Sequence, residues 1–469
     1  MSDYRAFLAT KHPSAPAAGF AVPPDALNPA LFPFQRAVTS WALERGRAAI
    51  FARMGLGKTP MQLTWAAEVC RHTGRDLLIL APLVVGAQTA REGEKFGVPV
   101  TVCRDQADAR PGINVTNYER LDRFDPRRFV GAVADESSIV KAYTGVTKRR
   151  LVEFFAHLDY ALACTATPAP NDHLELGNHA ELLRVMSSHE MIARWFIADQ
   201  SQMGTYRLKR HGAADFWRWV ATWGISLRRP SDLGFPDDGY ALPPLHTHVL
   251  TVDVDITTET EGKLFRLPDL NATGLHREGR RTVQARARAV AELVNAPGHG
   301  GRECWAVWCN TDYEADALLA RIPDAVEVRG SQPIEEKEAK LAAFTAGSAR
   351  VLITKPRIAG FGLNWQHCAH TAFVGLSYSF EQLHQALGRL HRFGQRRPVH
   401  AYIVGAATEG AIWEAVRRKA ADHERMQEAM VAAGDKLRRS ADRDRRARYT
   451  PATPLRLPDW LYDHLEVAS

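Results

Sequence analysis

The sequence predicts two α/β domains in tandem, each built around a mainly parallel sheet. With 469 residues, the chain exceeds the length at which one hydrophobic core keeps growing. In both halves, short apolar runs alternate with longer amphipathic stretches, as a sheet covered by helices on both faces requires. Between the halves, "RPSDLGFPDDGYALPPL" (229–245) concentrates Pro, Gly and Asp, which indicates a domain boundary.

Four strands are predicted in the first half, at 48–51, 77–81, 129–134 and 160–164. Each is followed at once by a polar or glycine-containing motif. Because ligands of open α/β sheets bind beyond the carboxyl ends of the strands, these motifs should converge on one edge. The next stretch, 179–229, shows helical spacing, several tryptophans and no convincing strand, so we expect a helical appendage there.

The second half repeats the alternation from Cys304 onward. The runs "CWAVWC", "AVEVRG", "ARVLITK", "HTAFVG" and "VHAYIVG" predict its strands. Before it, 276–294 has the pattern of a basic helix, and 436–448 is a basic stretch that indicates either a solvated segment or an arm facing nucleic acid. The expected organisation is a first domain at 1–230 with its appendage at about 179–230, a linker with a basic helical segment at 231–300, a second domain at 301–434 and a basic tail at 435–469.

Composition narrows the class of protein. Lys and Arg number 60 against 53 Asp and Glu, a net charge of +7, which suits a polyanionic partner such as nucleic acid, although solubility alone would also explain it. The six cysteines form no C-x-x-C pair, so neither a zinc site nor a disulfide framework is indicated. No signal peptide and no apolar run of the ~18 residues of a membrane span are visible, so we expect a cytoplasmic or nucleoid-associated protein.

The stretch "FARMGLGKTP" (51–60) has the pattern of a phosphate-binding loop that joins a strand to a helix. In such a loop the backbone N–H groups and the helix N-terminus surround phosphates. Gly55 and Gly57 allow close backbone approach, Lys58 supplies a charge for the outer phosphates, and Thr59 offers a hydroxyl to Mg²⁺. Ala52 stands where the general pattern has its first glycine, and we expect the loop to tolerate this.

Two further motifs supply groups for phosphoryl transfer. In "FVGAVADESS" an apolar strand ends at Asp135 and Glu136; the first carboxylate can hold Mg²⁺ and the second can orient or deprotonate the attacking water. An Asp-Glu pair alone would usually belong to a solvated loop. Because this pair lies downstream of a phosphate loop, we expect it to be functional. In "QALGRLHRFGQ", Arg389 and Arg392 lie three residues apart on one predicted helical face, where they can stabilise charge on the γ-phosphate. Because these arginines belong to the second domain, hydrolysis would require the domains to close.

In this order the motifs resemble those of helicase superfamily two, and within it the Snf-type DNA-translocating ATPases, including compact phage and bacterial members. "MGLGKT" and "QALGRLHRFGQ" are close to that family's motifs, and "LFPFQRAVTSWAL" resembles its adenine-reading segment. "VTNYERL", "CTATPAPNDHLELGNHAELL", "VWCN" and "ITKPRIAGFGLNWQ" resemble others, so that the resemblance runs from about 32 to 405. The resemblance implies nucleotide contacts from Phe34, Gln35, Met54, Gly55, Leu56, Gly57, Lys58, Thr59 and Gly362, metal contacts from Thr59 and Asp135, and catalytic roles for Lys58, Asp135, Glu136, Arg389 and Arg392.

The resemblance further implies two RecA-like domains with ATP and Mg²⁺ in the cleft between them, and DNA-stimulated ATP hydrolysis coupled to movement along duplex DNA. The sequence departs from the family at three places. Ala52 and Arg53 replace acidic residues, "DESS" replaces D-E-A-H, and "KPRIAG" replaces a glycine-rich run. Since Ser138 replaces a histidine that links nucleotide state to the rest of the cleft, the expected effect is on coupling and not on hydrolysis.

Three functions remain open from the sequence. The first is a duplex DNA translocase that follows the phosphate backbone without regard to sequence. The second is a strand-separating helicase acting on DNA or on RNA, which needs a wedge between the strands that the sequence does not reveal. The third is a nucleic-acid-binding scaffold without turnover, against which the retained catalytic residues argue.

Overall fold

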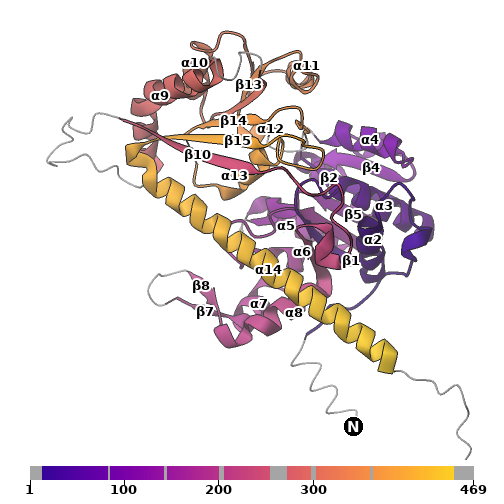
Figure 1. The fold of residues 1–469 in the computed structure, drawn as a ribbon. Helices are drawn as coiled ribbons and strands as arrows, with labels where there is room; N and C mark the ends of the chain where they lie inside the picture. Colours follow the sequence, from indigo (N-terminus) through magenta and orange to yellow (C-terminus); the bar gives the residue numbers. More distant parts are fainter. Residues whose placement is uncertain are drawn as a thin grey trace, which may run out of the picture.

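The computed structural model describes residues 13–82, 85–141, 145–199, 205–253, 272–296, 303–359, 363–375 and 377–447. Within these residues the strands form two large parallel sheets and one small antiparallel pair. The two sheets lie in two bodies, the first coloured indigo to magenta and the second orange in Figure 1. The predicted fold class, two α/β domains with parallel sheets, is therefore confirmed.

The first sheet has the strand order β3-β4-β2-β5-β6-β1-β9, with every neighbouring pair parallel. Its strands are β1 (Arg47–Ala52), β2 (Asp76–Ala81), β3 (Val100–Val102), β4 (Ile113–Asn117), β5 (Phe129–Asp135), β6 (Tyr160–Thr165) and β9 (Gly224–Leu227). The four predicted strands are β1, β2, β5 and β6, and all seven residues of β5 are buried. Burial on both faces explains why these strands are continuous apolar runs.

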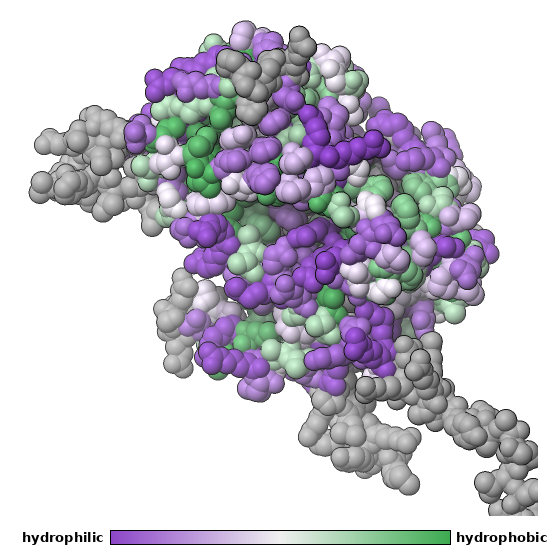
Figure 2. All heavy atoms as spheres, viewed as in Figure 1, coloured by the Kyte–Doolittle hydropathy of each residue, from purple (hydrophilic) through white to green (hydrophobic). Residues whose placement is uncertain are grey.

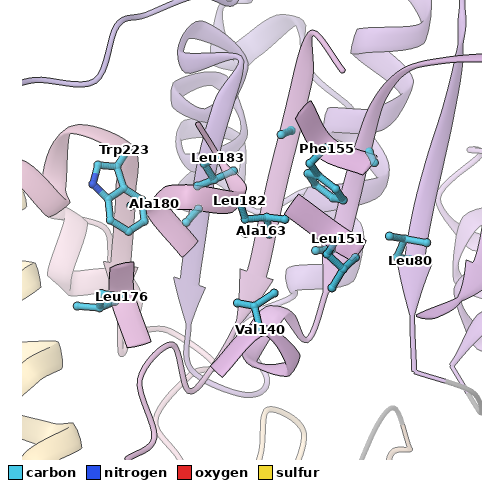
Figure 3. Close-up of a cluster of buried hydrophobic side chains, with 14 of the residues drawn as sticks. Leu80, Val140, Leu151, Phe155, Ala163, Leu176, Ala180, Leu182, Leu183 and Trp223 are labelled. Carbon is cyan, nitrogen blue, oxygen red and sulfur yellow. The ribbon is translucent and has the colours of Figure 1, made fainter. Parts of the chain in front are cut away.

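Helices cover this sheet, and an appendage follows β6. The helices are α2 (Pro33–Arg45), α3 (Lys58–Thr73), α4 (Gly86–Lys95) and α5 (Val146–Ala156), followed in the appendage by α6 (Glu175–Leu182), α7 (Ser188–Trp195) and α8 (Ala213–Trp223). Figure 3 shows the core between sheet and appendage, where Ala163 of β6 lies beside Leu182 of α6, and to which Leu176 and Ala180 of α6 also belong. The tryptophans of α8 belong to this core, and Trp219 and Trp223 are fully buried. They therefore serve packing.

The prediction that the appendage holds no strand is wrong. β9 pairs in parallel with β1 and completes the first sheet, and β7 (Phe196–Ala198) pairs with β8 (Tyr206–Leu208) in a hairpin between α7 and α8. β9 has only four residues, "GISL", directly after a helix. A strand so short shows no period of its own in the sequence.

The second sheet has the strand order β10-β15-β14-β11-β13-β12, again parallel throughout. Its strands are β10 (Leu245–Val252), β11 (Trp305–Trp308), β12 (Ala325–Val328), β13 (Val351–Thr354), β14 (His370–Val374) and β15 (Val399–Ala406). The helices are α9 (Ala272–Asn295), α10 (Asp312–Leu319), α11 (Ile334–Thr345), α12 (Pro356–Ala359), α13 (Phe380–Leu387) and α14 (Gly410–Ala447). Short 3₁₀ helices occur at Pro24–Ala26, Gln106–Asp108, Tyr118–Arg123, Pro126–Arg128, Ser137–Lys141, Arg210–Gly212, Pro230–Leu233 and Ala407–Glu409.

The segment predicted as a linker, 231–300, contributes to the second domain. β10 pairs with β15 along all eight of its residues, and Arg286 of the basic helix α9 is buried, donating to Glu314 at 2.8 Å and to the Val374 carbonyl at 2.9 Å. β10 is an edge strand with five of its eight residues exposed, so its sequence lacks the apolar run of a central strand. The charge of α9 therefore serves partly to hold the second domain together.

α14 is a single helix of 38 residues that starts beside β15 and crosses to the first domain, where it lies against α8 and β9 (Figure 1). The predicted basic tail from 435 thus begins inside this helix, and 448–469 lies outside the described residues. None of the described helices has the length and apolar composition needed to cross a membrane.

Candidate nucleotide site between the two domains

The phosphate loop leaves β1 and ends at the N-terminus of α3, as its sequence predicts. Gly55 and Gly57 have φ angles of +87° and +78°, values that residues other than glycine rarely adopt. Lys58 is the first residue of α3, and its Nζ donates to the Ala52 carbonyl at 3.0 Å. Ala52 itself is the last residue of β1 and pairs with Leu227. It has ordinary strand geometry, which explains why no glycine is needed there.

The two carboxylates lie where β5 ends, opposite the loop. Burial and the neighbouring Glu136 raise the pKa of Asp135 to about 7, although Lys58 opposes this shift. Burial lowers the pKa of Lys58, against the charges of Glu136 and Asp135. The Tyr118 hydroxyl donates to the Asp135 carbonyl at 2.6 Å and so fixes the end of the strand. The site thus holds a half-buried lysine in the field of two carboxylates.

Glu136 connects three motifs. Its φ is +54°, an uncommon value for a residue with a side chain. In this conformation its Oε2 accepts from the Thr165 hydroxyl at 3.4 Å and from Gln385 Nε2 of α13 at 3.2 Å. The carboxylate of the first domain is therefore in direct contact with the second domain.

Arg389 and Arg392 approach the same site from the second domain. Arg389 is 4% exposed and donates to the Leu363 carbonyl at 3.1 Å and the Gln385 side chain at 3.1 Å. Arg392 also donates to Leu363, at 3.3 Å. Burial lowers the pKa of Arg389 to about 10; burial, with the charge of Arg389, lowers the pKa of Arg392 to about 9. Both stay charged at neutral pH.

A cavity of about 390 Å³ between the domains brings these groups together, a volume typical of small-ligand sites. Its lining includes Lys58, Thr59, Asp135, Glu136, Arg389 and Arg392. The loop and the second domain are in close contact here: a Cβ atom on Gly55 would lie 2.7 Å from the Phe393 nitrogen. Arg389 and Arg392 lie in the turns after α13 (Phe380–Leu387), which ends before them at Gly388, so they do not share the helical face that their spacing predicts. This segment nevertheless faces the phosphate loop.

Of the other residues that the resemblance implies as nucleotide contacts, some line the cavity and some are buried behind it. Met54 and Gly55 line the cavity, whereas Phe34, Gln35 and Leu56 are buried, with 2%, 3% and 4% exposed. The Gln35 side chain accepts from the Phe32 nitrogen at 3.0 Å and donates to the Leu56 carbonyl at 3.0 Å, so it braces the loop. Gly362 lies outside the described residues.

Sequence reasoning assigned no role to several residues that hold the site. Gln385 is the first residue of the motif "QALGRLHRFGQ", and its spacing of four residues from Arg389 could have indicated that both side chains face the cleft. Lys141 and Glu381 form an ion pair between the domains. Near "DESS", the buried His179 of α6 contacts the Ser137 hydroxyl at 3.0 Å. The Lys141–Glu381 pair connects the two domains, and the His179–Ser137 contact holds the end of β5 against α6 within the first domain, where Ser138 stands in place of the family's histidine.

The donor set fits a magnesium ion that is held partly by a phosphate chain. Among the described residues, no group of three or more His, Cys, Asp or Glu side chains could bind a metal without other ligands. Mg²⁺ commonly takes one or two protein oxygens and completes its shell with water and substrate phosphates. Thr59 and Asp135, which line one cavity, provide that number. Burial, and after it the charge of Glu136, raises the pKa of Asp135, and a bound cation would favour the charged carboxylate against both.

The known proteins and the family model that this chain is similar to are all described as helicases. Residues 286–394 match the model of the helicase conserved C-terminal domain. The mouse protein "DNA annealing helicase and endonuclease ZRANB3" is 25% identical over 85% of this chain and 41% of its own length. "Uncharacterized ATP-dependent helicase YqhH" of Bacillus subtilis strain 168 is 24% identical over 79% of this chain and 74% of its own length. The chain thus spans about two fifths of the first relative and three quarters of the second.

Among solved structures, the chain is similar to the "Sulfolobus solfataricus SWI2/SNF2 ATPase core in complex with dsDNA". The similarity covers 82% of this chain and 90% of the other, at 17% identity and a TM-score of 0.41.

Proposed function

We propose that the chain is a Snf-type helicase of superfamily two and an ATPase that moves along duplex DNA, a proposal that the match to the helicase conserved C-terminal domain and the similarity to helicases support. The observation that carries this proposal is the composition of the cavity between the domains. One wall supplies Lys58 and the carboxylates Asp135 and Glu136, and the other supplies Arg389 and Arg392. These are the groups that phosphoryl transfer needs, and they come from two bodies that can move.

In the proposed reaction, the loop amides and Lys58 hold the phosphate chain of ATP at the N-terminus of α3. Glu136 orients the attacking water and accepts its proton. Arg389 and Arg392 stabilise the charge that develops on the γ-phosphate. When bound, Mg²⁺ would neutralise phosphate charge from a position held by Thr59 and Asp135.

Closure of the domains would link this chemistry to movement. Gln385 of α13 donates to Glu136, so separating the domains would take away both this contact and the arginines. A polyanion that spans both domains favours the closed arrangement. The net charge of +7 and the relatives named as DNA annealing helicases support DNA in that role, with contacts to the backbone. Such a partner would place the protein in the cytoplasm or nucleoid.

A second candidate function is strand separation on DNA or RNA. The β7–β8 hairpin projects from the appendage with Ile197 and Tyr206 exposed, and apolar side chains on a protruding hairpin are suited to separating base pairs. ATP hydrolysis measured with duplex DNA, single-stranded DNA and RNA, together with displacement of a labelled strand, distinguishes the two functions. Stimulation by duplex without displacement supports translocation; displacement that Ile197→Ser and Tyr206→Ser abolish supports unwinding.

The assignment of the catalytic groups is tested by substitution. Lys58→Ala should lose nucleotide binding, because the phosphates lose their buried positive charge. Arg392→Ala should bind ATP and hydrolyse it about 10³-fold more slowly, the lower range for an arginine that acts on the transition state. Arg418→Ala, on an exposed turn of α14, is the matched control. A normal DNA-stimulated rate in Arg392→Ala would exclude this role.

A further inference from the structure

Two cysteines of the second domain lie beside each other where two adjacent strands begin. β11 and β14 run in parallel, with Trp305 opposite His370. Cys304 directly precedes β11, and Cys368 comes two residues before β14. Neighbouring strands lie about 4.8 Å apart, and a disulfide joins Cα atoms that are about 4.4 to 6.8 Å apart. The register of the sheet therefore brings together two thiols that are 64 positions apart in the sequence.

The Cys368 thiol is directed at Cys304. It donates to the Cys304 carbonyl at 3.0 Å, and its sulfur lies 3.2 Å from the His370 carbonyl oxygen. By rotation about the Cβ–Sγ bond, the same proton can reach the Cys304 sulfur, with which the thiol also forms a side-chain hydrogen bond. The Cys368 backbone is fixed, since its nitrogen donates to the Trp365 carbonyl at 3.0 Å and its carbonyl accepts from Gln395 at 2.9 Å. The fold thus holds the two sulfurs next to each other.

The two thiols differ in their access to solvent and in their charge. Cys368 is fully buried, and burial raises the pKa of its thiol. Cys304 is partly exposed. The hydrogen bond from Cys368, together with His367 and Arg397, lowers the pKa of Cys304 to about 6, although burial opposes this shift. At neutral pH, Cys304 is therefore mostly thiolate, the form of cysteine that attacks electrophiles, whereas Cys368 keeps its proton.

The charged groups near Cys304 are anchored to the fold. Arg397 donates to the His367 carbonyl at 2.7 Å and to the Glu303 carboxylate at 2.9 Å. Glu303 is the acidic group at this corner of the domain. It is paired with Arg397 and lies 3.9 Å from His370 Nε2, so its negative charge has partners of its own and acts little on the thiolate.

We propose that Cys304 and Cys368 form a redox-active pair, which a hydroperoxide such as hydrogen peroxide oxidises to a disulfide. This chemistry goes beyond the proposed function and does not depend on it.

The oxidation proceeds in two steps. First, the Cys304 thiolate attacks one oxygen of hydrogen peroxide: an S–O bond forms, the O–O bond breaks, and the hydroxide that leaves takes up a proton to become water. Cys304 is then a sulfenic acid. Second, the Cys368 sulfur attacks the Cys304 sulfur: an S–S bond forms, the S–O bond breaks, and hydroxide leaves as water with the proton of Cys368. Two thiols and one hydrogen peroxide thus give one disulfide and two water molecules.

The first measurement is the rate at which iodoacetamide labels each cysteine of the reduced full chain, followed by peptide mass spectrometry. Cys70 is the internal reference, because it is also partly exposed but burial and the charge of Asp76 raise its pKa to about 11. Cys304 should react at least about tenfold faster than Cys70 at pH 7. From pH 7 to pH 8 its rate should rise less than about twofold, against about tenfold for Cys70. Labelling of Cys304 no faster than that of Cys70 would overturn its role as the thiolate.

Oxidation of the full chain with hydrogen peroxide tests the pair itself. Wild type should give a cross-linked peptide pair that joins Cys304 to Cys368, located by fragmentation and separated by dithiothreitol. Cys368→Ser should instead keep a sulfenic acid on Cys304, which dimedone traps. Cys304→Ser should leave Cys368 unoxidised, because Cys368 is buried. Cys70→Ser is the control and should form the cross-link as wild type does.

The outcomes decide the pair without any assay of nucleotide hydrolysis. No cross-link in wild type, or a cross-link of Cys304 to another cysteine, would overturn the pair. Oxidation of Cys368 to the same extent in Cys304→Ser would also overturn it. Since wild type alone supplies the labelling rates and the cross-link, a variant that fails to fold does not prevent a decision. A chain without ATPase activity would contradict the proposed function and leave this inference standing.

Discussion

Glu136 shows at the level of one residue how the two domains share a reaction. A left-handed backbone costs a non-glycine residue about 1 to 2 kcal/mol, and here that conformation lets one carboxylate meet Thr165 and Gln385 at once. The sequence suggested the chemistry of Glu136 from its neighbours along the chain. Its contact with Gln385 spans 249 positions, and no local pattern could reveal it.

Gln385→Ala should lower the DNA-stimulated kcat about tenfold with little change in KM. A hydrogen bond to a charged group contributes about 1.5 to 3 kcal/mol, and this bond acts on the group that orients water, not on nucleotide binding. Steady-state ATPase kinetics check the prediction. Gln382→Ala, on the same helix but bonded to Ser377, should stay near wild type; an equal loss in both variants would indicate general damage to α13.

His179 should make the protein less stable in mild acid. Burial lowers its pKa from 6.5 to about 4, so the unfolded chain binds the proton more readily than the folded one. The contribution of neutral His179 to the free energy of unfolding is therefore fully present above about pH 6.5 and is lost as the pH drops toward 4. At pH 5 the loss from this residue is about 2 kcal/mol. Thermal unfolding at pH 7.5 and pH 5 should show a smaller difference for His179→Asn than for wild type. His211→Asn, at an exposed site, should leave the difference unchanged, and a full pH effect in His179→Asn would contradict the prediction.

Among the elements, α14 connects the domains most extensively. It pairs with the phosphate loop through Arg53 and Glu424 and with the end of β9 through Arg228 and Glu428, while Met426 and Met430 enter the core of the first domain. Hydrophilic side chains are prominent on the surface where α14 crosses the molecule (Figure 2), as expected for the outer side of a helix whose apolar residues face the first domain. Arg53, which departs from the acidic residue of the family, thus has a partner on this helix.

Met426→Ala should destabilise the first domain although the residue follows the second sheet in sequence. Met426 is 1% exposed, and truncating a buried methionine costs about 2 to 5 kcal/mol. Thermal unfolding followed by tryptophan fluorescence includes the first domain, because Trp219 and Trp223 lie in the same core as Met426. Since Trp305, Trp308 and Trp365 report on the second domain, the expected result is a transition at lower temperature that carries part of the signal. Arg418→Ala, exposed on the same helix, should change little; a domain equally stable in Met426→Ala would show that α14 is only loosely attached.

At the scale of the whole molecule, polar pairs across the cleft set how the domains meet. Lys141 and Glu381 pair across it, and Glu381 is only 5% exposed. Glu136 with Gln385 lies on the same boundary. Because these contacts across the cleft are polar, and the apolar contacts of α14 lie elsewhere, the cleft can open at modest cost while α14 stays seated, as a cycle of binding and release requires.

Exchanging the charges of this pair tests the closed arrangement. Glu381→Lys should reduce the DNA-stimulated ATPase about tenfold, because two cations then face each other across the cleft. Adding Lys141→Glu should restore a large part of the rate, since the pair is reformed with its signs reversed. ATPase assays on both single variants and the double variant provide the measurement. No recovery in the double variant would mean that the pair does not control closure.

The sequence predicted most of the fold because the central strands are buried on both faces and followed by glycine-rich or charged motifs. β5 with Asp135 and β1 with its loop are the clearest cases. The prediction of strands from the sequence failed for the short strand β9 and the edge strand β10, since neither shows an apolar run. The catalytic groups could be named from motifs, but the partners of Glu136, Arg53 and Cys304 could not. These contacts depend on how separate segments meet in space.

The course of α14 has a consequence for how the protein would behave between cycles. At about 1.5 Å per residue, its 38 residues form a rod long enough to reach across the neighbouring domain, with its far half seated there. Two halves tethered in this way keep a high effective concentration for each other after every release. The two domains would then close again by a rotation about the seated half of α14, and the rate of closing would not depend on a diffusional search.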